Sequence, residues 1–194
     1  ALKKANIYEQ TLIVFSSDHG MSAFENKQAA IEPAEALKQA GFKVATSQKE
    51  IKDDTQLVVL ASGSRFIYLR KDLSPKQLTL FKTTLNNITG AELWDTAKLR
   101  NEYHAGPHSG DYAMVPKPGY AMSDANNKGG LHGRPSEKNT IMILRGPGIK
   151  KDTIIPHAEN VDIVPTIEYF LNVSSAKTVD GKVIKEAFTK NISN

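Results

Sequence analysis

The stretch Thr11-Leu-Ile-Val-Phe-Ser-Ser-Asp-His-Gly20 decides the fold class. Its first five residues are apolar or β-branched, a pattern typical of a strand that is buried on both faces, as in a parallel sheet. The run ends in a polar turn that contains Asp18 and His19. Further strand candidates alternate with helices along the chain, at residues 43–46, 57–61, 65–70, 112–115 and 139–144. We therefore predict an α/β protein, built as a three-layer α/β/α sandwich with a mostly parallel sheet.

Helix signals lie between these strands. Ser74-Pro75-Lys76-Gln77 predicts a helix that begins with a capping box, because Ser74 can be the N-cap and Gln77 stands at the third helical position. Another helix is expected over residues 33–40. Asp162 is expected to cap a third helix, whose inner face would carry Ile163, Ile167, Phe170 and Leu171. Residues 103–135 are rich in Gly, Pro, His, Ser and Asn, which favours long loops around one strand.

The composition is that of an ordinary globular protein and excludes several function classes. The chain has 194 residues, of which 40% are hydrophobic and 24% are charged, and this length suits one domain over residues 1–194. Its longest apolar runs are far below the ~18 residues of a membrane span. The absence of cysteine excludes disulfides, thiol catalysis and Cys-ligated zinc. Lys and Arg are scattered despite a net charge of +4, so no nucleic-acid-binding signal is present.

Asp18 and His19 are the strongest candidates for chemistry, because both side chains are common metal ligands. Neighbouring side chains of a strand point to opposite faces. Two adjacent residues can therefore reach one ion only where the strand gives way to a turn, and Gly20 supplies that freedom. The alternative is that Asp18 caps the segment that follows and His19 is an exposed loop residue.

His132 is the second candidate, in the stretch Gly129-Gly130-Leu131-His132-Gly133. A histidine between glycines has little side-chain crowding and a mobile backbone, which suits a ligand that must approach an ion closely. The alternative is an ordinary glycine turn that carries an exposed histidine.

Several segments together resemble the type I phosphodiesterase/nucleotide pyrophosphatase family of the alkaline phosphatase superfamily. The segment from Thr11 to Met21 is similar to the family's strand followed by Ser-Asp-His-Gly-Met. Five further segments follow in the family's order: Gly110-Asp-Tyr-Ala-Met-Val-Pro-Lys-Pro-Gly119, Gly130-Leu-His-Gly133, Gly146-Pro-Gly-Ile149, Asn160-Val-Asp-Ile-Val-Pro-Thr166 and Asp180-Gly181. The resemblance therefore covers nearly the whole chain.

This resemblance implies a site with two divalent metal ions, expected to be zinc, at the carboxyl edge of the sheet. Asp18 and His19 would bind one ion and His132 the other. The family's Thr or Ser nucleophile and its remaining ligands lie in an N-terminal half that this sequence does not contain. The chain is therefore expected to be the C-terminal half of the catalytic domain, to pair with that missing half and to be inactive alone.

The function implied is metal-dependent hydrolysis of phosphodiester or pyrophosphate bonds, with a small phosphodiester or nucleotide as substrate. Two alternatives stay open. Related members of the superfamily hydrolyse phosphonates, phosphomonoesters or sulfate esters or act as phosphomutases, and a catalytically inactive binding module of the same fold is also compatible with the sequence. The resemblance alone favours a place outside the cytoplasm.

Overall fold

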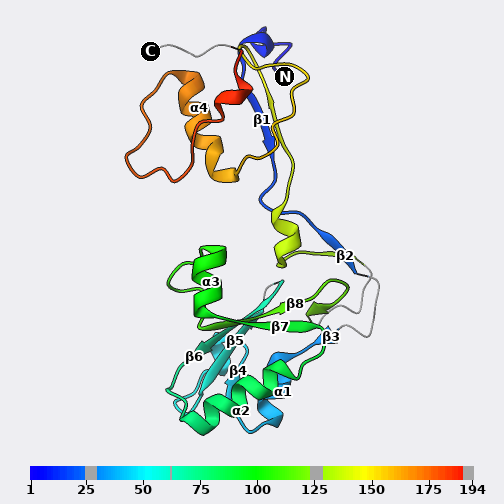
Figure 1. Ribbon diagram of the computed structural model, residues 1–194, viewed down its shortest axis with the longest axis vertical. Helices are drawn as coiled ribbons and strands as arrows, with labels where there is room; N and C mark the ends of the chain where they lie inside the picture. Colours follow the sequence, from blue (N-terminus) through cyan, green and yellow to red (C-terminus); the bar gives the residue numbers. More distant parts are fainter. Residues whose placement is uncertain (25–29, 62, 123–128, 190–194) are drawn as a thin grey trace. The chain divides into compact units, whose positions relative to one another are not determined.

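The computed structural model describes residues 1–24, 30–61, 63–122 and 129–189, and the chain divides into two compact units (Figure 1). Unit 1 consists of Ala1–Gly20 together with Asn139–Asn194, and unit 2 consists of Met21–Lys138. Each unit has its own hydrophobic core. The expected single domain over residues 1–194 therefore stays a prediction.

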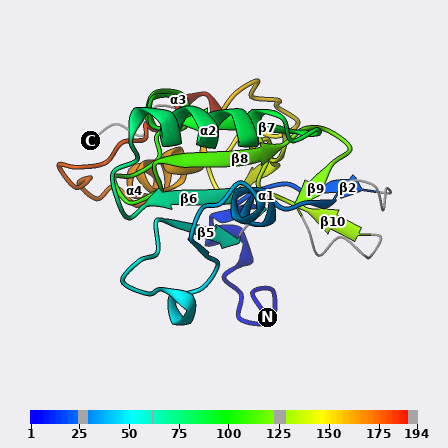
Figure 2. The same ribbon diagram turned by 90° about the horizontal axis from the view of Figure 1, so that it is seen from below.

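Unit 2 is built around a five-stranded sheet with the order β4-β5-β6-β8-β7. Its strands are β4 (Val44–Ala45), β5 (Leu57–Ala61), β6 (Arg65–Leu69), β7 (Ala91–Asp95) and β8 (Tyr112–Pro116). Figure 2 shows β5, β6, β8 and β7 side by side in this order. The strands expected at 57–61, 65–70 and 112–115 are therefore present.

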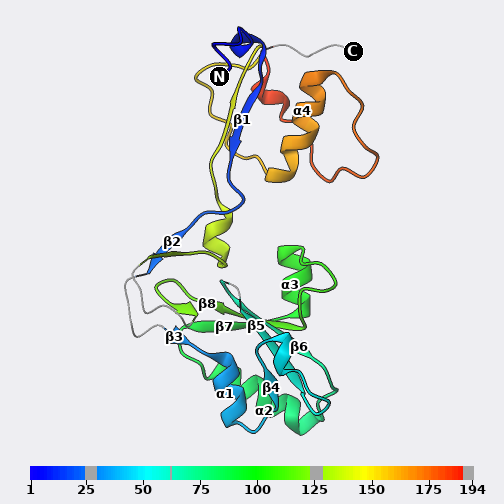
Figure 3. The same ribbon diagram turned by 180° about the vertical axis from the view of Figure 1, so that it is seen from behind.

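Helices cover both faces of this sheet (Figures 1 and 3). The main core, which includes Ile67 and Met114, packs against α1 (Pro33–Gln39) and α2 (Pro75–Asn86) on one face. The neighbouring strand residue Ala113 belongs to a second core, in which α3 (Thr96–Tyr103) contributes Leu99. Alternate residues of a strand point to opposite faces, so the two cores lie on opposite sides of the sheet. This arrangement confirms the α/β/α class.

The expectation of a mostly parallel sheet was wrong for this sheet. In the described residues β4 pairs with β5 in parallel, whereas the β5–β6, β6–β8 and β8–β7 pairs are all antiparallel. The connection from β5 to β6 is too short for the crossover that parallel neighbours need, so a hairpin forms. The strands have the same apolar pattern whether they pair in parallel or antiparallel, because helices bury both faces of the sheet.

Unit 1 contains an antiparallel ribbon of β1 (Ile13–Ser16) and β11 (Met142–Arg145). Leu144 faces a core made with α4 (Ile163–Leu171) and the segment around Phe188. The side chains of Phe15 and Ile143, which are paired in register, are 58% and 51% exposed. The prediction that the first strand is buried on both faces was therefore wrong, because the described residues form a core on one side of the ribbon only.

Shorter elements complete the two units. Two-stranded pairs are formed by β2 (Ser22–Phe24) with β10 (Gly129–Leu131) and by β3 (Ala30–Ile31) with β9 (Ala121–Met122). Single 3-10 turns are η1 (Tyr8–Gln10), η3 (Gln48–Glu50), η4 (Pro135–Lys138), η5 (Asn160–Asp162) and η6 (Lys185–Ala187). Of the loops expected over 103–135, residues 123–128 lie outside the described residues. In the described ranges, no helix combines the length and the apolar character needed to cross a membrane.

The helix signals agree with the structure in part. Ser74 and Gln77 form the expected capping box at α2, and Gly41 follows α1 with a φ of +91°. In α4, Phe170 packs into the core, but Leu171 is 58% exposed and does not lie on the inner face. The helix ends there at Asn172, which has a left-handed backbone and turns the chain away.

We expect Ser74→Ala to lower the free energy of unfolding by about 1 kcal/mol. The Ser74 hydroxyl accepts a hydrogen bond from the Gln77 N–H, and the Gln77 side chain accepts one from the Ser74 N–H. Urea denaturation would measure the loss, with Lys76→Ala, an exposed position of the same turn, as the control. Equal stability of Ser74→Ala and the wild type would contradict the role of the box.

Candidate metal-binding site

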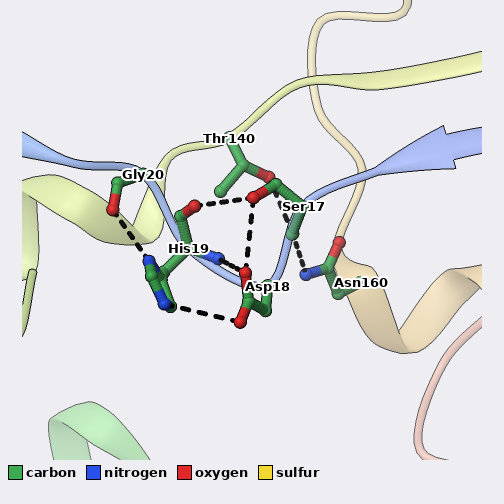
Figure 4. Close-up of polar contacts among 6 residues, drawn as sticks. All are labelled: Ser17, Asp18, His19, Gly20, Thr140 and Asn160. Atoms are coloured by element: carbon green, nitrogen blue, oxygen red, sulfur yellow. Dashed lines mark hydrogen bonds and ion pairs between the residues drawn. The ribbon is translucent and has the colours of Figure 1, made fainter.

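Asp18 and His19 lie together where the chain leaves β1, in unit 1 (Figure 4). The Asp18 Oδ1 atom accepts a hydrogen bond from the His19 backbone N–H at 3.0 Å, and Asp18 Oδ2 lies 3.4 Å from His19 Nε2. The Asp18 side chain is 84% exposed and the His19 side chain 37%. The turn therefore brings a carboxylate oxygen and an imidazole nitrogen to one accessible point, as the sequence predicts.

The contacts of the turn favour a charged Asp18 carboxylate. The backbone N–H of His19, followed by the nearby imidazole, lowers the pKa of Asp18 below its ordinary value, so the carboxylate is charged at neutral pH. The His19 Nδ1 atom lies 2.9 Å from the Gly20 carbonyl oxygen. A proton on Nδ1 would be donated to that carbonyl, and Nε2 would then have the lone pair that a metal needs.

Ser17 and its neighbours fix the backbone of this turn (Figure 4). The Ser17 hydroxyl donates to the His19 carbonyl at 2.7 Å. The Ser17 carbonyl accepts hydrogen bonds from the Asn160 amide at 2.8 Å and from the Thr140 hydroxyl at 3.3 Å. The Asn160 side chain also accepts a hydrogen bond from the Ser16 hydroxyl at 2.8 Å. Two distant segments of the chain therefore hold the end of β1 in place.

Asp162 has a different role from the helix cap that we expected. Its side chain makes no capping hydrogen bond to α4. Its oxygens accept instead from the backbone N–H groups of Glu159 and Lys182, at 3.0 and 2.9 Å. Burial raises the pKa of this carboxyl, but the two N–H donors outweigh burial and hold the pKa below its ordinary value. Asp162 thus ties residues 159–162, and Asn160 with them, to the loop at Lys182.

His132 lies in unit 2, in the turn between β10 and η4, and is exposed. Its neighbour Gly133 has a φ of +110°, and a Cβ there would lie 2.6 Å from the Gly63 backbone. The Ser64 hydroxyl donates to the Gly133 carbonyl oxygen. We had expected a mobile backbone, but Gly133 instead permits close packing of two main-chain segments. This packing holds the His132 turn against the start of β6.

Glu137 fixes the other side of the His132 turn and was not expected from the sequence. Its side chain is 2% exposed and pairs with Arg134, whose Nε lies 2.9 Å from Oε1. The hydroxyls of Ser22 and Ser136 donate to the same carboxylate, as does the backbone N–H of Arg134. The Arg134-x-x-Glu137 spacing was the available sequence signal, because residues three apart face each other in a helical turn.

The structure therefore brings together part of the predicted metal site. Asp18 and His19 are adjacent in unit 1, whereas His132 belongs to unit 2. Over the described ranges, no group of three or more Asp, Glu, His or Cys side chains is arranged to hold a metal ion. Catalytic zinc commonly has three protein ligands. Asp18 and His19 have donor atoms of the kind that zinc binds, but two side chains are fewer than such a site commonly has.

Comparison with known proteins identifies the family. The family model described as type I phosphodiesterase/nucleotide pyrophosphatase matches residues 1–141, and this range includes Asp18, His19 and His132. The chain belongs to this family. The recognition made from the sequence segments is thereby confirmed. No curated protein matched the chain.

Solved structures share the fold. The chain is similar to human ectonucleotide pyrophosphatase/phosphodiesterase 5, with a TM-score of 0.68 and 14% identity. The murine ectonucleotide pyrophosphatase/phosphodiesterase 5 gives a TM-score of 0.70 and also 14% identity. Both alignments cover 97% of this chain and 48% of the neighbour's chain. The chain thus spans about half the length of these structures and is similar to them in fold.

Proposed function

We propose that this chain is part of a divalent-metal-dependent hydrolase of phosphodiester or pyrophosphate bonds. Membership of the phosphodiesterase/nucleotide pyrophosphatase family supports a hydrolase of this type. The observation that carries the metal assignment is the turn after β1, where Asp18 Oδ2 and His19 Nε2 lie 3.4 Å apart. A charged carboxylate offsets the charge of the ion, and an imidazole adds a neutral ligand.

In this proposal Asp18 and His19 hold one ion and His132 holds a second, and zinc is the metal. Bound zinc ions supply Lewis-acid chemistry, because they stabilise negative charge on phosphoryl oxygens and on a nucleophile. Other residues of this chain hold the proposed ligands in position. Asn160 and Thr140 donate hydrogen bonds to the Ser17 carbonyl, beside the Asp18–His19 turn. On the C-terminal side of His132, the Ser64 hydroxyl donates to the Gly133 carbonyl, and Glu137 accepts from the Arg134 N–H.

The rest of the site is proposed to come from outside this sequence. The solved relatives are about twice as long as the aligned region. The exposed apolar face of the β1–β11 ribbon, with Phe15 and Ile143, offers a surface on which another part of the domain can pack. We propose that the missing half of the catalytic domain packs there and provides a Thr or Ser nucleophile and further metal ligands.

Hydrolysis assays on the full-length protein test this function. The substrates are bis-p-nitrophenyl phosphate as a diester, p-nitrophenyl phosphate as a monoester, and p-nitrophenyl phenylphosphonate as a phosphonate. We expect the diester to be hydrolysed fastest, the activity to be lost with a chelator, and zinc to restore it. Preference for the monoester or the phosphonate would contradict the proposed substrate class. Nucleotide binding without turnover would indicate an inactive binding module.

A further inference from the structure

Unit 2 contains a cavity of about 250 Å³, lined by residues of α3 and of the strands β6, β7 and β8. Its walls are mostly apolar and include the aromatic side chains of Phe66, Trp94 and Tyr103. The Trp94 and Tyr103 rings are stacked, with centroids 4.4 Å apart and an interplanar angle of 22°. All the lining residues belong to unit 2. A rigid aromatic wall of this kind suits a flat apolar group.

A buried cation also lines this cavity. The Arg134 side chain is 5% exposed, and its Nε atom is paired with Glu137. Its Nη2 atom is buried and has no hydrogen-bond partner among the residues that the structure describes. A buried donor without an acceptor is costly, by more than a typical hydrogen bond is worth. Arg134 therefore contributes a buried guanidinium to the cavity wall, with one N–H donor group that lacks an acceptor among the described residues.

The charges around the cavity favour an anion. Arg134 and Lys138 both line it, and Lys138 Nζ lies 6.0 Å from the centre of the Tyr103 ring. Glu137 is the carboxylate paired with Arg134, so these two cations and one carboxylate leave one positive charge in excess. A guanidinium is well suited to bind a carboxylate, because its N–H groups form charge-assisted hydrogen bonds.

We propose that this cavity binds a small aromatic monocarboxylate. The ring would pack against Phe66, Trp94 and Tyr103, and the carboxylate would pair with the cationic side chains of the lining, Arg134 and Lys138. The volume is below the roughly 300–1,000 Å³ of sites for drug-sized molecules, so the cavity fits one ring with a short side chain. This site does not depend on the proposed hydrolase function, and its ligand belongs to a different class from phosphodiesters.

The structure supplies a direct reporter for the test. Trp94 is the single tryptophan of the chain and lines the cavity, so its fluorescence reports occupancy. The probe is 3-phenylpropionate, compared with 3-phenylpropan-1-ol, which lacks the charge, and with propionate, which lacks the ring. We expect 3-phenylpropionate to change the Trp94 emission with a Kd of about 1 mM or below. The alcohol should bind about tenfold or more weakly, and propionate should cause no change.

Two variants separate the apolar and the charged parts of the site. Ala105→Leu extends a half-buried lining residue into the cavity and should abolish binding while the thermal transition is retained. The double variant Arg134→Gln/Glu137→Gln removes both charges of the buried pair together and leaves Lys138 in place, so it should reduce the preference for the acid over the alcohol. Arg70→Met, an exposed arginine that does not line the cavity, is the matched control and should bind as the wild type does. Calorimetry confirms each affinity.

The outcomes decide the proposal. Binding of the acid that is lost in Ala105→Leu and kept in Arg70→Met supports the site. Equal affinity of the wild type for acid and alcohol would overturn the role of Arg134. Unchanged binding in Ala105→Leu, or no binding of 3-phenylpropionate to the folded wild type, would overturn the proposal as a whole.

Discussion

Replacing Asp18 by Asn is expected to weaken zinc binding by the full-length protein by roughly 10²- to 10³-fold. Structural zinc sites with four ligands bind with apparent free energies of about 10–16 kcal/mol, so one ligand contributes about 2.5–4 kcal/mol. In Asp18→Asn, the amide oxygen can still accept the hydrogen bond that the His19 N–H donates to Oδ1. The turn would therefore persist while the charge that offsets the ion is lost.

His132→Gln is the companion variant and should remove the second binding event of a two-ion titration. His132 belongs to a different unit from Asp18 and His19, so we expect each variant to leave the other event largely intact. Isothermal titration calorimetry with zinc measures both events, and near-ultraviolet circular dichroism checks that each variant is folded. Hydrolysis of the diester should fall in both variants and should recover in part at high zinc for Asp18→Asn.

Matched controls make this test specific. Asp152→Asn changes an exposed aspartate of unit 1, and His108→Gln changes an exposed histidine of unit 2. Both should bind zinc as the wild type does. Wild-type zinc affinity in Asp18→Asn would refute Asp18 as a ligand. A loss in His108→Gln equal to that in His132→Gln would show that His132 has no special role.

Local sequence signals predicted the parts of the fold that depend on neighbouring residues. The capping box at Ser74 and Gln77 forms because its partners are three residues apart. The turn that brings Asp18 toward His19 is local in the same sense. Pairing direction is not local: β5 and β6 are apolar in a way that fits either orientation, and the short connection decides between them.

Of the elements missed by sequence analysis, β7 depends on its pairing with the later strand β8, whereas α3 begins at a local cap. β7 and α3 lie in a polar stretch with weak apolar periodicity, and we did not predict them. They are stabilised by the stacking of Trp94 on Tyr103 and by an Asp95 cap, which accepts from the Lys98 N–H at 2.9 Å. No sequence pattern indicated that Trp94 would contact this helix, because tertiary packing supplies most of the stability of a short helix.

The contacts that hold the candidate site in place could not be predicted either, because they join residues that are far apart in the sequence. Asn160 reaches the Ser17 carbonyl across 143 positions of sequence. Asn160 opens a segment that carries the family resemblance, but its partner is visible only in the folded chain. Asp162, two residues later, was assigned to a helix cap because Asp often has that role. Its two backbone donors at Glu159 and Lys182 instead bind it into the loop that positions Asn160.

Glu137→Ala is expected to lower the stability of unit 2 by about 3–5 kcal/mol, because it leaves a buried guanidinium without its partner. The carboxylate and Arg134 are 2% and 5% exposed, so water cannot replace the lost contact. The hydroxyl of Ser22 on β2 and the Arg134 N–H would lose their acceptor as well. Urea denaturation followed by the fluorescence of Trp94, which lies in unit 2, measures this unit directly.

Two comparisons show whether burial causes the effect. Glu92→Ala removes a carboxylate that is 52% exposed and paired with Lys98, and it should cost no more than about 1 kcal/mol. The double variant Arg134→Met/Glu137→Met replaces the buried pair by apolar groups and should recover much of the stability lost in Glu137→Ala. Equal losses in Glu92→Ala and Glu137→Ala would contradict the role of the buried pair.

The same carboxyl makes the stability of unit 2 depend on pH. Burial raises the pKa of Glu137, but hydrogen bonds from Ser22, the Arg134 N–H and Ser136, with the Arg134 charge, outweigh burial and lower the pKa. A group whose pKa is lower in the folded state stabilises that state above its unfolded pKa, about 4.3 for Glu. The stabilisation is then lost as the pH falls through the lowered folded value. The difference in the free energy of unfolding between the wild type and Glu137→Gln should therefore be constant near pH 7 and shrink below about pH 4. A difference that stays constant down to acid unfolding would show that Glu137 is not ionised in the folded protein.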